Sequence, residues 1–293
     1  MPEQPLAEVF GFPIDNLTPV AEYHRENYLC PYNNRVPNCT KDKANDPLGV
    51  CSVYEGDHAV ITCPVRFRQN WMIATDAASF LFPRGRRWTS LAEVRLEDKD
   101  GRSAGNIDVV LVAYDDKGQV IDFGALEVQA VYISGNVRRP FEYYMEDPEG
   151  RCGMQWTGQL NYPRPDYLSS SRKRLAPQLI HKGGILHTWG KKLAVAADRH
   201  FFASLPSLPE TEQEQADIAW LVYDLALDSR ENRYNLIMHR HTYTFFEPAL
   251  ESITKAEAGP VEEFLRQLQT KLDEKLDAGY PPDTPTLFDL IEE

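Results

Sequence analysis

The chain has 293 residues, of which 42% are hydrophobic and 26% are charged, as in an ordinary soluble globular protein. It contains no apolar run of the roughly 18 to 20 residues that a membrane span needs, and its acidic N-terminus, MPEQPLAEVFGFPIDN, lacks the apolar core of a secretory signal. We therefore expect a cytoplasmic protein with reduced thiols. The net charge of −13 is unevenly placed, because residues 206–293 hold 19 acidic and 7 basic side chains and the remainder is almost neutral.

Four of the five cysteines lie close together in the sequence, as Cys30, Cys39, Cys51 and Cys63. In a reducing compartment, such spacing favours a tetrahedral four-cysteine metal site over disulfides, and both iron and zinc accept four thiolates. The intervening sequence is rich in Pro, Asn, Gly and Lys and indicates loops, which metal binding would stabilise. We predict a loop-rich four-cysteine metal-binding module over residues 1–70. Buried thiols without a metal remain the alternative, and Cys152 is interpreted as a lone thiol.

The next segments predict one helix and then three antiparallel strands. WMIATDAASFLFP, residues 71–83, is typical of a helix that ends at its proline. LAEVRLED, NIDVVLVAY and QVIDFGALEVQAVYIS are typical of strands, and the turn sequences KDGR and DDKG between them complete a meander. Ser90 and Glu93 also match a capping box, so a short helix from Leu91 competes with the first strand.

Polar side chains interrupt the third of these strands. Glu127 and Gln129 lie two residues apart within GALEVQAVY, and therefore on the same face of a buried strand. Asp108 opens the neighbouring strand, so that its carboxylate and that of Glu127 can meet at one point. Two adjacent carboxylates repel each other unless a cation lies between them, and oxygen ligands suit Mg²⁺. An Asp followed about 20 residues later by Glu-x-(Lys/Gln) in a hairpin resembles the motif of PD-(D/E)XK nucleases.

The C-terminal half predicts a further helix, more strands and a closing helix. SSSRKRLAPQLIHKGG reads as a serine-capped helix that ends at its two glycines, and ILHTWGKKLAVAA follows as strand sequence. IAWLVYDLAL and RYNLIMHRHTYTFF read as later strands. AGPVEEFLRQLQTKLDEKL is a helix whose apolar stripe we expect to pack in the core. This order predicts an α/β fold with a mixed sheet flanked by helices, forming a nuclease domain over residues 71–293.

Several segments together resemble the NotI-type restriction endonucleases. These segments are GVCSVYEGDHAVITCP, LEVQAVYISGNVRRP and RKRLAPQLIHKGG, and the likeness runs from VFGFP near the N-terminus to the closing helix. The resemblance implies a PD-(D/E)XK core preceded by a four-cysteine site that holds iron, and homodimers that cut GC-rich palindromes with Mg²⁺. It also implies a cognate DNA methyltransferase as a functional companion. Its active-site positions fall on Glu93, Asp108, Glu127 and Gln129, and Gln in place of the usual Lys is a feature of this family.

These positions suggest chemical roles. We expect Asp108 and Glu127 to hold Mg²⁺, with Glu93 serving a second metal or a water molecule. The structural alternatives are a buried ion pair for Glu127, a turn residue that caps a strand for Asp108, a satisfied core amide for Gln129, and a capping-box partner or solvent-facing strand residue for Glu93. Gln129 cannot act as a base, but it can orient water or phosphate through hydrogen bonds. The resemblance implies double-stranded DNA as the partner. Residues 151–205 contain nine basic and two acidic side chains, which on charge alone more often form a solvated face than a binding site. The candidate DNA contacts are Arg138, Arg139, Arg172, Lys173, Arg174, Gln178 and Lys182.

Two other functions fit the same sequence features. One is a catalytically inactive DNA-binding relative that keeps the cysteine site and the nuclease scaffold. The other is a repair or RNA-processing nuclease of the same superfamily that cuts without sequence specificity. Buried carboxylates argue against the inactive relative, because their burial is unfavourable and an inactive site does not need them.

Overall fold

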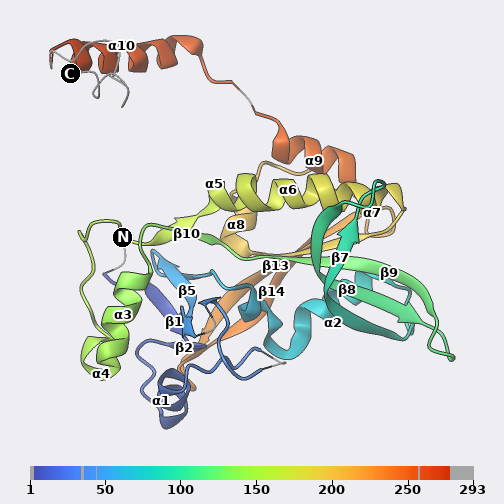
Figure 1. The fold of residues 1–293 in the computed structure, drawn as a ribbon, viewed down its shortest axis with the longest axis horizontal. Helices are drawn as coiled ribbons and strands as arrows, with labels where there is room; N and C mark the ends of the chain where they lie inside the picture. The colour runs from blue at the N-terminus through green and yellow to red at the C-terminus, as the bar shows by residue number, and fades with distance from the viewer. Residues whose placement is uncertain (1–2, 34–35, 44, 257, 278–293) are drawn as a thin grey trace, which may run out of the picture. The chain divides into compact units, whose positions relative to one another are not determined.

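The computed structural model describes residues 3–33, 36–43, 45–256 and 258–277. Contacts between residues divide the chain into two compact units, Met1–Thr254 and Lys255–Glu293. The first unit contains a six-stranded mixed sheet with helices on both faces, as the order of the sequence elements predicts (Figure 1). None of the helices within the described ranges combines the length and the hydrophobicity of a membrane span.

The central sheet has the strand order β14-β13-β12-β9-β8-β7. Strands β9, β12 and β13 run parallel to one another, whereas the pairs β13–β14, β9–β8 and β8–β7 are antiparallel. Parallel neighbours need a long crossover, and a helical run supplies it between β9 and β12. The strands are β7 (Trp88–Glu97), β8 (Ser103–Tyr114), β9 (Val120–Gln129), β12 (Leu193–Asp198), β13 (Ile218–Asp228) and β14 (Arg233–Thr244).

The predicted meander is confirmed by β7, β8 and β9. Each of its two turns is closed by an aspartate whose side chain accepts backbone N–H bonds two and four residues later. Asp98 accepts from Asp100 and Arg102, and Asp115 accepts from Lys117 and Gln119, all at 2.9 Å. The segment around Ser90 and Glu93 is strand β7, so the competing helix is not formed.

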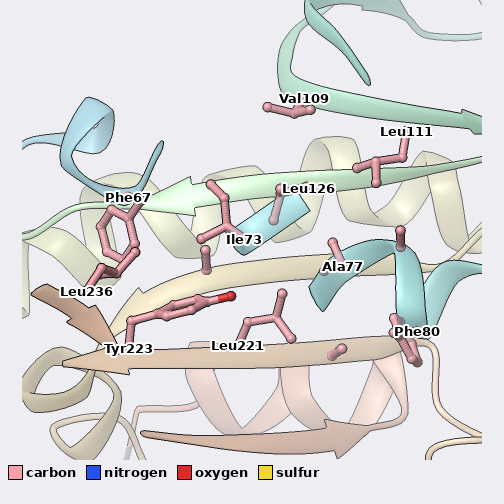
Figure 2. Close-up of a cluster of buried hydrophobic side chains, with 14 of the residues drawn as sticks. Phe67, Ile73, Ala77, Phe80, Val109, Leu111, Leu126, Leu221, Tyr223 and Leu236 are labelled. Carbon is pink, nitrogen blue, oxygen red and sulfur yellow. The ribbon is translucent and has the colours of Figure 1, made fainter. Parts of the chain in front are cut away.

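Helices cover both faces of the central sheet (Figure 1). The predicted helix α2 (Met72–Leu81) packs on one face, and Figure 2 shows the resulting core, in which Ile73 lies with Leu111, Leu126 and Leu221. On the other face, a second core contains Trp220 and the apolar side of the crossover. That layer comprises α5 (Tyr167–Ser170), η2 (Ser171–Leu175), α6 (Ala176–Gln178), η3 (Leu179–Gly183), α7 (Gly184–Thr188), α8 (Arg199–Ala203) and α9 (Phe246–Thr254).

The helical run from Tyr167 to Thr188, which we call the crossover helix, continues beyond the point at which the sequence predicted its end. Helical turns run without a break through Gly183 and Gly184 to Thr188, so the expected strand sequence ILHT is helical and β12 begins only at Leu193. A Cβ atom at Gly183 would lie 2.7 Å from Cε2 of Phe246, so this glycine permits close packing against α9 and does not end the helix. Two π-helical segments, η2 and η3, lie within the same run.

The N-terminal part contains more regular structure than its loop-like sequence indicates. Its second sheet, with the order β2-β1-β5-β6, packs in a third core with α3 and with Trp156. Its elements are β1 (Leu6–Val9), β2 (Phe12–Pro13), α1 (Pro19–Glu26), β3 (Asp42–Lys43), β4 (Asp46–Pro47), β5 (Val50–Glu55), β6 (His58–Ile61) and η1 (Pro64–Trp71). Beyond the meander follow β10 (Tyr132–Ser134), α3 (Arg138–Glu146), α4 (Pro148–Arg151) and β11 (Arg164–Asp166).

The closing helix α10 (Val261–Asp277) forms where the sequence predicted it, in the second unit. None of the residues of α10 is buried, and the expected core packing of its apolar stripe stays a prediction. Phe264 is 59% exposed and Leu268 is 45% exposed. Helical periodicity reports an apolar face but does not report what covers it.

Candidate active site

Asp108 and Glu127 are brought together by the pairing of β8 with β9. The antiparallel ladder pairs Val109 with Leu126, and the next position in each strand is Asp108 on one side and Glu127 on the other. Directly opposed residues of an antiparallel pair point to the same face of the sheet. Here that face is the one covered by the crossover helix, because Ala125, two residues before Glu127, belongs to the core on that side. The expected meeting of the two carboxylates is what this register produces.

The two carboxylates have different surroundings. Oδ2 of the half-buried Asp108 accepts a hydrogen bond of 2.9 Å from the backbone N–H of Val128, which fixes this carboxylate at the end of the ladder. Glu127 is only 2% exposed. Burial, and then the negative charge of Asp108, raises the pKa of the Glu127 carboxyl to about 8, although Lys182 acts in the opposite direction. A strongly shifted carboxyl beside a second one is typical of a functional site.

Lys182 completes this cluster from the crossover helix. Its Nζ donates to both carboxylate oxygens of Glu127, at 2.9 Å to Oε1 and 2.8 Å to Oε2. We expected Lys182 to contact DNA, whereas in the structure it is buried and paired with Glu127. One sequence signal could have indicated this position, because Lys182 continues the spacing of the core residues Leu175, Leu179 and Leu186 along the helix.

Gln129 lies two residues beyond Glu127 and is equally buried, at 2% exposure. Its Nε2 donates a hydrogen bond of 3.1 Å to the backbone carbonyl of Ala130. The amide is therefore held by the neighbouring residue of its own strand end. It adds hydrogen-bonding capacity to the cluster but no charge.

Glu93 lies in β7 at the position next to Asp108, so Glu93, Asp108 and Glu127 form one row across the three strands. Its flanking residues Ala92 and Val94 pair with Val109 and Ile107, so that Glu93 falls beside Asp108 in the register. Its φ of 55° is unusual for a strand residue other than glycine and marks local backbone strain. The side chain is exposed, and no hydrogen bond or ion pair joins it to another cluster member within the described residues. Glu93 therefore lies beside Asp108 in the register, but its side chain does not contact Asp108, Glu127, Gln129 or Lys182 through a hydrogen bond or ion pair within the described residues.

Comparison with known families matches the chain to one of them. The family model described as Restriction endonuclease NotI matches residues 8–236, which is more than half of the chain and includes every cluster residue named above. The chain belongs to the NotI restriction endonuclease family. As a member of the NotI family it is a type II restriction endonuclease, a hydrolase that cleaves double-stranded DNA internally. No curated protein matches the chain.

The four predicted metal-ligating cysteines also lie within the span that matches the NotI family. All four line one cavity of about 10 Å³, which is about the space that one water molecule needs. The cavity lies beside the second sheet, where Cys51 belongs to β5 and Cys63 follows β6. All five cysteines lie within the described residues, and each of them is a free thiol. Within the described ranges, no three His, Cys, Asp or Glu side chains stand in the arrangement of a metal site.

Burial shapes the chemistry of these thiols. It raises the pKa of Cys30 to about 11, with a smaller contribution from the neighbouring Cys63 and Cys39. The pKa of Cys51 is also raised, first by burial and then by Cys63. Two basic side chains line the cavity but are held elsewhere, because Lys41 donates to the backbone carbonyls of Val50 and Thr62 and Arg66 pairs with Glu8.

The candidate DNA contacts of this NotI-family chain fall into two groups. Arg138 is engaged within the protein, because it pairs with Asp42 at 2.7 Å and with Asp46 at 2.9 Å. Gln178 is half-buried, and its Oε1 has no hydrogen-bond partner within the described residues. Lys182 is buried against Glu127. The other candidates are exposed, and two of them lie over aromatic rings, Arg139 over Trp156 and Arg174 over Tyr132. The exposed candidates are Arg139, Arg172, Lys173 and Arg174.

Proposed function

We propose that this endonuclease has a PD-(D/E)XK active site built from Asp108, Glu127, Gln129 and Glu93, and that it depends on Mg²⁺. The observation that carries the proposal is that Asp108 and Glu127 lie opposite each other, one position beyond the Val109–Leu126 pair that ends the β8–β9 ladder, on a face that buries Glu127 almost completely. Burying one carboxylate beside another is unfavourable, and this supports a functional reason for both.

The donor set fits a magnesium ion. Asp108 and Glu127 offer carboxylate oxygens, which are the ligands that Mg²⁺ prefers, and Oδ2 of Asp108 is already fixed by Val128. When bound, Mg²⁺ supplies positive charge that polarises the scissile phosphate and acidifies a water molecule. The protein positions the two carboxylates and, through the crossover helix, covers the face on which they lie.

Gln129 and Glu93 have supporting roles in this proposal. Gln129 hydrogen-bonds the water or the phosphate, since an amide both donates and accepts but cannot take up a proton. Glu93 sits on strained backbone at the exposed end of the row, which suits a residue that contributes only when substrate or a second metal is present.

The substrate in this proposal is a GC-rich palindrome cut by a homodimer. One chain carries one set of carboxylates and cuts one strand, so two chains related by a two-fold axis cut both strands of a two-fold site. The exposed arginines suit guanine, because a guanidinium pairs bidentately with guanine in the major groove. Residues 151–205 contain nine basic and two acidic side chains, and binding by such a segment should weaken as the salt concentration rises.

For the four cysteines we propose one structural iron or zinc ion in each chain. The support is their shared cavity and the absence of disulfides among them. Thiolate ligation would offset the unfavourable ionisation of buried thiols, because the metal supplies positive charge where burial opposes deprotonation. The residues involved belong to the 1–70 segment, to which we assign this metal-binding role.

Digestion of a plasmid that carries GC-rich palindromes tests the proposed function. We expect Mg²⁺ to give discrete bands with the wild-type enzyme and intact plasmid with Asp108→Asn. Glu97→Gln is the matched control, because Glu97 is an exposed carboxylate at the end of β7, and it should cut like wild type. A smear in place of bands would indicate a nonspecific nuclease, no cleavage would indicate an inactive relative, and cutting by Asp108→Asn would contradict the active site.

A further inference from the structure

The ammonium group of Lys182 occupies a position where the crossover helix otherwise presents leucines to the sheet. Leu175, Leu179 and Leu186 of the same helix are at most 1% exposed and belong to the core, and Lys182 is 7% exposed between them. A buried charge lowers stability by several kcal/mol unless it is paired, and here Nζ is paired with both oxygens of Glu127. A leucine at this position would pack without that penalty, so the lysine calls for a chemical explanation.

The backbone around Lys182 leaves room for its side chain to reach Glu127. Lys182 lies in the π-helical segment η3, and single π-helical turns inside α-helices are frequent at functional sites. The next residue, Gly183, lets the helix approach α9 closely. On the sheet side, Gly105 of β8 has a φ of 100°, and a Cβ atom there would lie 3.5 Å from Cε of Lys182. The stem of the lysine therefore passes over a glycine on its way to Glu127 on β9.

The motif residue two positions after Glu127 carries no charge. Gln129 shares the face of Glu127 but is neutral, and its Nε2 donates to Ala130. When Glu127 is ionised, Asp108 and Glu127 together bring two negative charges, and the cation of Lys182 contacts Glu127. The cluster thus contains a lysine that arrives from the helix above the sheet, while the strand itself contributes an amide.

We propose that Lys182 is a positioning residue of the cleavage reaction, which supplies from the crossover helix the positive charge that Gln129 lacks. It acts through Glu127, whose two oxygens it holds at 2.8–2.9 Å, and so keeps this carboxylate oriented toward Asp108. It also keeps a fixed positive charge beside the place where the negative scissile phosphate must approach. The inference rests on the proposed active site at Asp108 and Glu127.

The test compares Lys182→Met with two matched lysine variants. Lys117→Met removes an exposed lysine in the β8–β9 turn and should leave cleavage and binding unchanged. Lys173→Met removes an exposed lysine of the crossover helix and should weaken DNA binding, with the salt dependence reduced by about one counterion. Lys182→Met should lower the single-turnover cleavage rate about 100-fold at saturating Mg²⁺, as expected for the loss of one preorganised charge.

DNA binding separates positioning from a phosphate contact. With Ca²⁺ in place of Mg²⁺, Lys182→Met should bind the cognate site within about twofold of wild type and with an unchanged salt slope. A salt slope reduced as in Lys173→Met would make Lys182 a phosphate contact and overturn the proposal. Cleavage within about threefold of wild type would also overturn it, and the loss of activity in Asp108→Asn would then show that the proposed active site itself still stands.

Moving the charge gives a second, independent readout. Lys182→Gln combined with Gln129→Lys returns a lysine to the face of Glu127, from the strand in place of the helix. We expect this double variant to recover at least about tenfold of the rate that Lys182→Gln loses. If Lys182→Met fails to fold, the double variant is compared directly with wild type. Normal DNA binding together with a rate no higher than that of Lys182→Gln, or below about 1% of wild type, would contradict the positioning role.

Discussion

The cysteine cavity and the carboxylate cluster both gather groups whose ionised forms are disfavoured by burial, but they differ in where compensating charge comes from. At the carboxylates, the chain supplies it, because Lys182 pairs with Glu127. At the cysteines, Lys41 and Arg66 line the cavity, yet one is bound to backbone carbonyls and the other to Glu8. The difference predicts that a metal at the cysteines serves folding, whereas a metal at the carboxylates serves chemistry.

Loss of the cysteine metal should have the largest effect. Structural four-thiolate sites contribute about 10 kcal/mol or more to folding, so Cys51→Ser should unfold the N-terminal sheet or leave it without metal. Cys152→Ser is the control, because its thiol lies outside the cavity and donates to the carbonyl of Glu149. Elemental analysis and thermal unfolding check both variants. Freshly purified wild-type protein without iron or zinc would contradict the structural metal.

Removal of the Asp108 carboxylate should greatly reduce cleavage but change stability little. Asp108→Asn should reduce cleavage at least about 1,000-fold, because it removes a metal ligand and a charge at the reacting phosphate. The amide can still accept the bond from Val128, and repulsion of Glu127 is relieved, so the thermal midpoint should stay within about 3 °C of wild type or rise. A large loss of stability with Asp108→Asn would contradict the claim that the carboxylates serve chemistry whereas the cysteines serve folding.

The locations of both sites were readable in the sequence. Alternating strands and aspartate turns predicted the meander, and once β8 and β9 pair, Asp108 and Glu127 are neighbours by register. The crowding of four cysteines within residues 30–63 predicted one location for them, and they line one cavity. In both cases the decisive contacts are local in sequence or follow from a tight turn.

Long-range packing was not readable in the same way. The assignment of Lys182 to DNA followed from the charge of its neighbours, whereas its burial follows from docking of the helix on β8 and β9. Gly183 was interpreted as a helix end, but its packing against Phe246 depends on α9, more than 60 residues later. The insertion of β12 between β9 and β13 likewise depends on the crossover. Charge and propensity carry no information about which element covers another.

The pH dependence of metal binding sharpens the comparison further. The pKa of Glu127 is raised to about 8, so a divalent ion must displace a proton below that pH. Affinity for Ca²⁺ should rise about tenfold per pH unit up to pH 8 and then level off, as measured by calorimetry. Glu127→Gln should abolish this rise. A flat profile in the wild-type protein would show that Glu127 is ionised throughout.

The same shift has a consequence for the stability of the metal-free protein. The folded form retains a proton on Glu127 between the unfolded carboxyl value of 4.5 and about 8, so stability falls as pH rises through this window. Chemical denaturation at pH 5 and pH 8.5 measures the fall, and Glu127→Gln should reduce it. An equal fall in the variant would assign the effect to other groups.

The smallest expected effect is at Glu93. Glycine accommodates a φ of 55° without strain, so Glu93→Gly should change the free energy of unfolding by no more than about 1 kcal/mol. Cleavage should fall while DNA affinity is retained, because the carboxylate at the end of the row is removed. Denaturant unfolding and single-turnover cleavage measure the two effects. Unchanged cleavage would remove Glu93 from the active site.

Anomalous diffraction from crystals of the wild-type enzyme soaked in Mn²⁺ tests the two-site account most directly. Data collected at the manganese, iron and zinc absorption edges distinguish the metals at each position. The account predicts manganese between Asp108 and Glu127, and iron or zinc among Cys30, Cys39, Cys51 and Cys63. Manganese bound elsewhere on the chain, with none at the two carboxylates, would contradict it.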